Sequence, residues 1–201
     1  MPARIDPAQR RGQIVEAAFR LVIAEGITGM SLRKVAEESG LNIGSVRHCF
    51  DSHHALLTAA AEEAGNRMGR RLAGHPVERL RGLRGEVALD ALQALVETVL
   101  PLDEARREEA AVVVELIAAS RTMPVFRPIA ARMGADLTAV LREALTALEV
   151  PEAELAAAQV SAVVGGLTFD ALTPHGALSV EQLRTILRAH LRGLLGVSEP
   201  G

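Results

Sequence analysis

The chain has 201 residues, 49% of them hydrophobic and 23% charged, and a formal net charge of −3 at pH 7. Aromatic residues make up 2%, with no Tyr and no Trp, which argues against an all-β fold and against proteins that stack single-stranded bases on aromatic rings. The single cysteine excludes an internal disulfide and a cysteine-cluster metal or iron–sulfur site. Because the abundant Ala, Leu, Arg and Glu are strong helix formers, we expect an all-α protein.

Apolar residues at helical spacing, interrupted by Gly and Pro, predict nine helices. Asp6 followed by Pro7 begins the first helix and Gly26 ends it, while Ser179 and Gln182 form a capping box for the last. The expected helices span approximately 7–26, 31–40, 42–50, 52–75, 77–100, 103–121, 125–148, 152–172 and 180–195.

The charge is divided unevenly along the chain. Residues 1–81 carry a net charge of +3, whereas residues 82–201 carry −6. Lys34 is the one lysine among the 22 basic residues, the others being Arg. A basic front and an acidic back indicate that only the front meets a polyanion.

The second and third expected helices, with the glycine-containing turn between them, have the spacing of a helix-turn-helix. Arg33 and Lys34 begin the first of the two, where they and the backbone amides can meet phosphates. The second is too short and polar to be explained by burial, although Ile43, Val46 and Phe50 are expected to point inward. Its outward residues can hydrogen-bond to base edges or phosphates: Asn42, Gly44, Ser45, Arg47 and His48. The same spacing occurs in ordinary αα-hairpins, for which these charges are a solvated face.

Residues 31–50, SLRKVAEESGLNIGSVRHCF, followed by Ala55-Leu56-Leu57, resemble the DNA-binding region of the tetracycline-repressor family. The family pattern is a capping Thr or Ser, Ile-Ala, Gly-Val-Ser, then Gly-x-Leu-Tyr-x-His/Tyr-Phe and Lys, and the nine-helix layout extends the resemblance over nearly the whole chain. The resemblance implies a homodimeric repressor that binds a palindromic double-stranded operator and is released by a small molecule. It places a DNA-binding domain at 7–52 and an effector-binding and dimerisation domain at 53–197, with the helix from residue 53 connecting them.

The sequence departs from the family pattern at three positions. Arg47 stands where the family has Tyr, Cys49 where it has a second aromatic residue, and His53 where it has Lys. We expect Arg47 to hold a phosphate in place of the Tyr, and His53 to be a weaker substitute because His is mostly neutral at pH 7. Asn42 and Ser45 are the expected base readers. The predicted DNA-binding set is Ser31, Arg33, Lys34, Asn42, Ile43, Gly44, Ser45, Arg47, His48 and His53.

The apolar residues of the last two helices extend over more than one face of each helix, so packing on one side would not bury all of them. The resemblance implies a four-helix dimer interface, whereas packing within one chain is the alternative. The predicted interface residues are Val160, Val163, Val164, Leu167, Leu183, Leu187, Leu191 and Leu194.

Seven apolar and two acidic residues are predicted to line an effector pocket, with a plain core role as the alternative for each: Val99, Val112, Glu115, Leu116, Met123, Phe126, Met133, Phe169 and Asp170. Residues 100–107 and Gly165-Gly166-Leu167 are similar to a branch of the family that includes choline-responsive repressors. Quaternary ammonium sites use Trp or Tyr faces, which this chain lacks. We therefore expect an apolar or weakly cationic ligand instead of choline.

Other classes of protein find little support in the sequence. It has no nucleophile elbow, phosphate loop, zinc-ligand spacing or paired-acid motif, so we expect neither an enzyme nor a cofactor or metal. No apolar run approaches the roughly 20 residues of a membrane span, the longest being Ala110–Ala119, so we expect a cytoplasmic protein without a membrane partner. A helical adaptor that binds protein but not DNA is the remaining alternative.

Overall fold

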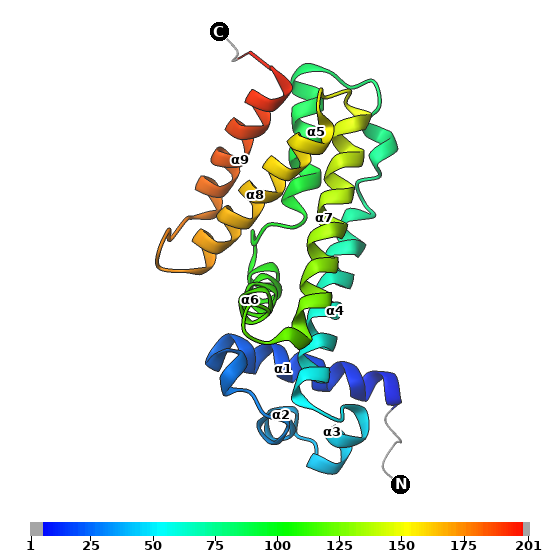
Figure 1. Ribbon diagram of the computed structural model, residues 1–201, viewed down its shortest axis with the longest axis vertical. Helices are drawn as coiled ribbons and strands as arrows, with labels where there is room; N and C mark the ends of the chain where they lie inside the picture. The colour runs from blue at the N-terminus through cyan, green and yellow to red at the C-terminus, as the bar shows by residue number, and fades with distance from the viewer. Residues whose placement is uncertain (1–5, 199–201) are drawn as a thin grey trace. The chain divides into compact units, whose positions relative to one another are not determined.

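The computed structural model describes residues 6–198, which form α-helices and short 3₁₀ turns and contain no strand (Figure 1). This confirms the all-α class. The helices are α1 (Pro7–Gly29), α2 (Leu32–Ser39), α3 (Ile43–Cys49), α4 (His53–Leu72), α5 (Gly85–Glu97), α6 (Glu104–Ala119), α7 (Arg127–Ala147), α8 (Ala153–Leu172) and α9 (Val180–Leu195), with 3₁₀ turns η1 (Val77–Leu80) and η2 (Pro124–Phe126).

The described chain divides into two compact units. Unit 1 combines residues up to 66 with 111–131, and unit 2 combines 67–110 with the residues from 132 onward. The division differs from the expected boundary at residue 52, because most of α4 and the end of α6 pack with the N-terminal helices. Helices α4, α6 and α7 each contribute residues to both units.

Two of the predicted helices are interrupted by glycines. The first continues to Gly29, but Gly26 has a φ of 72° and kinks it at the predicted end. The prediction of one continuous helix over 77–100 is wrong, because this stretch forms two separate elements, η1 and α5. Gly82 (φ 76°), between them, and Gly85 (φ 60°), the first residue of α5, adopt the left-handed conformation, which glycine accepts at the lowest cost.

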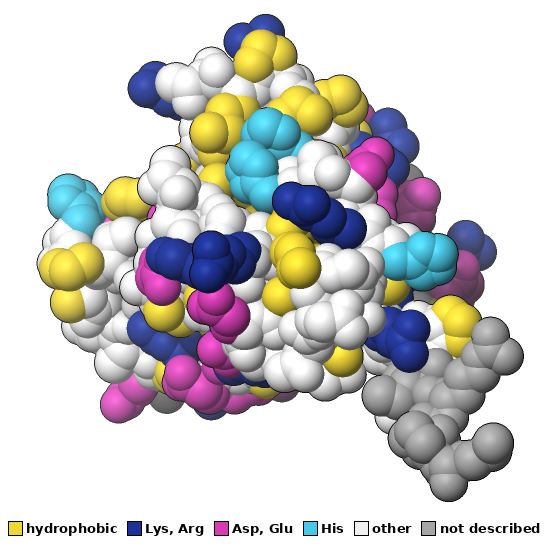
Figure 2. All heavy atoms as spheres, turned by 90° about the horizontal axis from the view of Figure 1, so that it is seen from below, with side chains coloured by type: hydrophobic (Ala, Val, Ile, Leu, Met, Phe, Trp, Pro, Cys, Tyr) yellow, Lys and Arg dark blue, Asp and Glu magenta, His cyan; other side chains and the backbone are white. Residues whose placement is uncertain are grey.

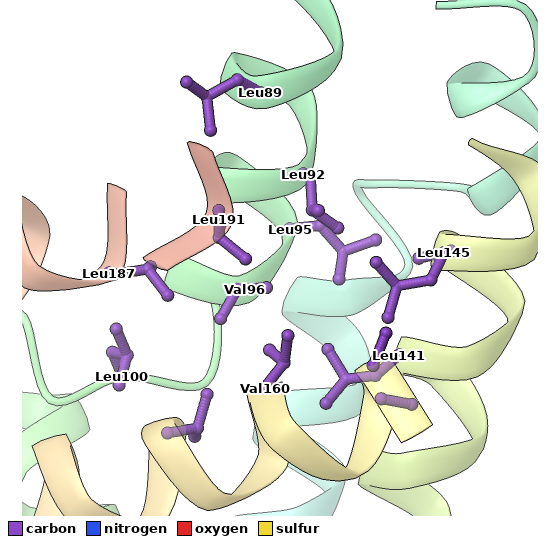
Figure 3. Close-up of a cluster of buried hydrophobic side chains, with 14 of the residues drawn as sticks. Leu89, Leu92, Leu95, Val96, Leu100, Leu141, Leu145, Val160, Leu187 and Leu191 are labelled. Carbon is purple, nitrogen blue, oxygen red and sulfur yellow. The ribbon is translucent and has the colours of Figure 1, made fainter. Parts of the chain in front are cut away.

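The core of unit 2 is built from leucines and valines of α5, α7, α8 and α9. Figure 3 shows Leu92 and Leu95 of α5 near Leu141 and Leu145 of α7, all of them buried. The same cluster includes six of the eight predicted interface residues, which are buried within the chain: Val160, Val164, Leu167, Leu183, Leu187 and Leu191. The other two, Val163 and Leu194, are half-buried against it.

A ladder of arginines ties α9 to α5. Arg188 donates to Glu86 and Asp90 at 2.8 Å each. One turn to either side, Arg192 binds Glu86 at 2.5 Å and Arg184 lies 3.3 Å from Glu97. The planar guanidinium presents its N–H donors in a fixed fork that bridges two carboxylates, whereas Lys is a point charge with rotatable donors, and this gives the bias toward arginine a structural use in unit 2.

Helix α8 leaves much of its apolar surface outside the core. By length and composition it could cross a membrane, so the expectation that no segment approaches such a length was wrong. Only 33% of its apolar 18-residue stretch is buried. The mostly buried core helix of a soluble protein passes the same test of length and composition, so this finding is weak evidence for a membrane span.

Candidate nucleic-acid interface

The α2–α3 hairpin is fixed by local capping. The Ser31 hydroxyl accepts the Lys34 N–H at 3.3 Å, and Asn42 Oδ1 accepts the Ser45 N–H at 2.8 Å. Gly40 ends α2 in the left-handed conformation, with φ 67°. These caps satisfy helix-end donors that would otherwise be unpaired, so the sequence sets the geometry of the turn.

A hollow of about 610 Å³ lies between α2 and α3. It brings together Ser31 and Arg33 from the start of α2 with Ile43 and Arg47 of α3, four of the predicted DNA-binding residues. The full lining is Ser31, Leu32, Arg33, Ala36, Glu37, Leu41, Ile43 and Arg47. Seen from below, the molecule exposes dark-blue Lys and Arg side chains beside yellow hydrophobic and cyan His side chains (Figure 2).

The predicted cationic side chains differ in how free they are to bind a phosphate. Arg47 is exposed and has no ion-pair partner among residues 6–198. Arg33 lies 3.4 Å from Glu37 in a solvent-exposed pair, which is worth about 0–1 kcal/mol and is readily given up to a phosphate. Lys34 is instead bound to Glu25 of α1. Arg47 and Arg33 are therefore the cations best placed for phosphate.

The expected base readers also have structural roles. The cap occupies Asn42 Oδ1, so the side-chain NH₂ is the group of Asn42 that faces no partner in the hairpin. A Cβ on Gly44 would lie 3.2 Å from that same oxygen, so the glycine is explained by the cap. Ser45 is half-buried and His48 is exposed.

His53 is half-buried at the start of α4, with its ring 4.0 Å from that of His54. Burial, and to a smaller extent the charge of His54, hold the pKa of His53 below its usual value. The imidazole is therefore neutral at pH 7, and it offers a phosphate one N–H donor without a positive charge. His54 packs edge-on against Phe126 of η2, at 5.5 Å, a contact that the sequence did not indicate.

Arg11 is a further residue that the sequence analysis missed. Its guanidinium lies 4.3 Å from the centre of the Phe50 ring, and its Nη1 donates to the Cys49 carbonyl at 3.4 Å. It thus binds the C-terminal end of α3 to α1. Cys49 itself is half-buried. No sequence spacing signals this pairing, because residues 38 positions apart meet only in the folded hairpin.

The predicted effector residues fall into both units. Val112, Leu116 and Phe126 are buried and Met123 is half-buried in unit 1, whereas Val99, Met133, Phe169 and Asp170 belong to unit 2. Glu115, also predicted to line the pocket, is exposed, and its Oε2 lies 3.8 Å from where a Cβ on Gly26 would be.

At the end of α8, Phe169 is exposed beside His175, and Asp170 packs against Gly176, where a Cβ would lie 2.3 Å from that of Asp170. A hollow of about 480 Å³ in unit 2 is lined by other residues: Val77, Glu78, Arg81, Gly82, Arg142, Glu143, Thr146, Ala147 and Glu149.

The outward faces of α8 and α9 form an apolar stripe, which we call the α8–α9 stripe. Its residues are exposed and recur every three or four positions, apart from the adjacent Gly165 and Gly166: Leu155, Ala158, Ala162, Gly165, Gly166 and Phe169 on α8, with Ile186, Ala189 and Gly193 on α9. A Cβ on Gly165, Gly166 or Gly193 would meet no atom within 4 Å. Packing within the described chain therefore gives no reason for glycine at these positions.

Family models match both the N-terminal and the C-terminal part of the chain. Residues 14–60 match the model described as bacterial regulatory proteins, tetR family, and residues 88–196 match that of BetI-type transcriptional repressors, C-terminal. The HTH-type transcriptional regulator PksA of Bacillus subtilis is 36% identical over 98 residues, 49% of this chain. The matched part spans about half of PksA, 47% of its length.

Solved structures match over nearly the whole chain. A transcriptional regulator from Rhodococcus sp. Rha1 is 28% identical with a TM-score of 0.82, over 92% of this chain and 96% of that one. A transcriptional regulator from Saccharomonospora viridis, solved with choline, is 22% identical with a TM-score of 0.74 over 92% and 96%. The latter shares the fold.

Proposed function

The chain belongs to the tetracycline-repressor family of bacterial regulatory proteins, with a BetI-type C-terminal part, and from that premise we propose that it is a homodimeric, ligand-responsive repressor of a palindromic operator. Its place of action is the cytoplasm. The observation that carries the DNA-binding part is the meeting of Arg33 and Arg47 at one hollow between α2 and α3, with Arg47 unpaired in the described chain.

Arg47→Ala is expected to weaken binding to every DNA sequence and to flatten its salt dependence. A phosphate contact contributes about 0.9 to the slope of log K against log salt, so loss of one contact per protomer lowers the slope by about 1.8 for a dimer. The measurement is fluorescence anisotropy on duplex DNA from 50 to 200 mM salt.

Arg79→Ala is the matched control, because Arg79 is an exposed arginine of η1 in unit 2. It should leave both the affinity and the slope unchanged. An unchanged slope for Arg47→Ala would remove Arg47 from the phosphate contacts.

The dimer is proposed to form through the α8–α9 stripe of each protomer. Six of the eight interface residues predicted from the sequence are buried in the core of unit 2. The stripe is the apolar surface of the same two helices that stays exposed in the single chain. Two-fold pairing places two α3 helices on one operator, with half-sites roughly 34 Å apart or a multiple of that distance.

The effector is proposed to be apolar or weakly cationic. A ligand that binds one conformation better shifts the population toward it, and helix α4, which contributes to both units, is the element through which we expect this shift to reach the hairpin.

In a thermal-shift assay we expect tetraphenylphosphonium, a mostly apolar cation whose charge is shielded by four phenyl rings, to raise the Tm. Choline should have little effect, because the chain has no Tyr or Trp for an aromatic cage. At 100 times its Kd a ligand adds about 2.7 kcal/mol to stability. Stabilisation by polar anions alone would contradict this assignment of the ligand class.

A further inference from the structure

Ile43, the first residue of α3, presents an exposed apolar side chain on the hairpin. The sequence analysis included Ile43 in the predicted DNA-binding set but expected its side chain to point inward with Val46 and Phe50, and that orientation was wrong. Val46 and Phe50 are 0% and 3% exposed, whereas Ile43 is 38% exposed. Ile43 and Arg47 are four positions apart and so share one face of the helix.

Ile43 shares the hollow between α2 and α3 with three apolar residues. Leu32, Ala36 and Leu41 line the same hollow, and Arg33 and Arg47 are the cations that border it. Ser31 and Glu37 complete the lining, and Glu37 is paired with Arg33. Ile43 thus lies beside an apolar patch that the two arginines border. Such a surface fits a groove of duplex DNA in which the apolar side chain meets an apolar group on a base and the arginines meet the neighbouring phosphates.

The major groove of DNA has one apolar group on its base edges, the 5-methyl of thymine. Cytosine, adenine and guanine present hydrogen-bonding atoms there, which Ile43 cannot satisfy. We propose that Ile43 contacts the 5-methyl group of a thymine in each operator half-site, adjacent to the phosphate held by Arg47. This inference rests on the proposed DNA-binding function and adds a base preference to it.

The test replaces each thymine of a selected operator in turn by deoxyuridine, which removes the methyl group and keeps the base pair. For the wild-type protein, one position per half-site is expected to lower the affinity about fourfold, or about 15-fold when both half-sites are changed, as for loss of one buried methyl-sized contact. The other thymines should give little change.

The variants then assign the effect to Ile43. Ile43→Ala is expected to bind the thymine operator more weakly and to lose its sensitivity at that one position, whereas Ile43→Val retains it. Ile23→Ala is the matched control, since Ile23 on α1 is also exposed, at 44%, and its profile should equal that of the wild type.

Two results overturn the proposal while leaving DNA binding in place. One is a wild-type affinity that responds to uracil at no position. The other is an Ile43→Ala profile that matches the wild-type profile position by position. A wild-type protein that binds no duplex at all would overturn the proposed function together with this inference, so the two failures are distinguishable.

Discussion

Replacing Arg71 with methionine is expected to lower the free energy of unfolding by about 3–5 kcal/mol, as does removal of one partner from a buried ion pair. Arg71, near the C-terminal end of α4, donates to Glu109 from Nη2 at 2.7 Å and from Nη1 at 3.3 Å. Its Nε donates to the Thr98 carbonyl at 2.9 Å. The Glu109 side chain is 4% exposed, so the variant leaves a buried carboxylate with Arg67 3.9 Å away.

The exposure of the two partners predicts an asymmetry. The Arg71 side chain is 29% exposed and can turn to water when its partner is removed. Glu109→Gln should therefore cost less, about 1–2 kcal/mol, and the double variant Arg71→Met with Glu109→Leu should recover most of the loss. Urea unfolding at one fixed protomer concentration gives these values. A loss below about 0.5 kcal/mol for Arg71→Met, the range of ordinary surface changes, would show that the pair contributes little.

Gly166→Arg is expected to separate the dimer and, with it, to lower operator affinity by at least about 100-fold, since about 2.7 kcal/mol suffices for that factor. Gly166 lies in the α8–α9 stripe with no atom within 4 Å of an added Cβ. The single chain accommodates the side chain and gains helix propensity over glycine. At a close helix–helix contact, the same side chain overpacks the interface and buries an unpaired charge.

The matched control is Gly134→Arg, which makes the same substitution at an exposed, open position of α7. Sedimentation equilibrium should show dimers for the control and monomers for Gly166→Arg, with similar circular dichroism for both. A Gly166→Arg protein that remains dimeric at micromolar concentration would place the interface elsewhere.

The sequence predicted best those elements that carry local signals at both ends. Helix α9 has the predicted bounds, because Ser179 and Gln182 cap its start and Gly196 ends it in the left-handed conformation. The hairpin was recognised for the same reason, through its caps and Gly40. The prediction of one helix over 77–100 failed where Gly82 and Gly85 take positive φ. A glycine in the sequence does not distinguish the two cases, because it occurs in helix interiors, at a cost, and also in turns.

The sequence could not show which face of an apolar helix turns inward. Helix α8 is apolar on most sides, so its spacing did not separate Val160 and Val164, which are buried, from Leu155 and Phe169, which are exposed. The availability of cations was equally hidden. Lys34 looked as free as Arg47, but it pairs with Glu25, nine positions earlier on α1, and only the packing of α1 against α2 creates that contact.

The central claim is that two copies of this chain read one palindromic duplex. The most direct measurement is selection of bound sequences from a pool of random double-stranded DNA at 50 mM salt. We predict enrichment of an inverted repeat whose half-site centres are separated by one helical turn or a multiple of it, about 10 base pairs per turn. A stable dimer that enriches no sequence and retains no duplex would contradict the claim and favour a helical adaptor that binds protein alone.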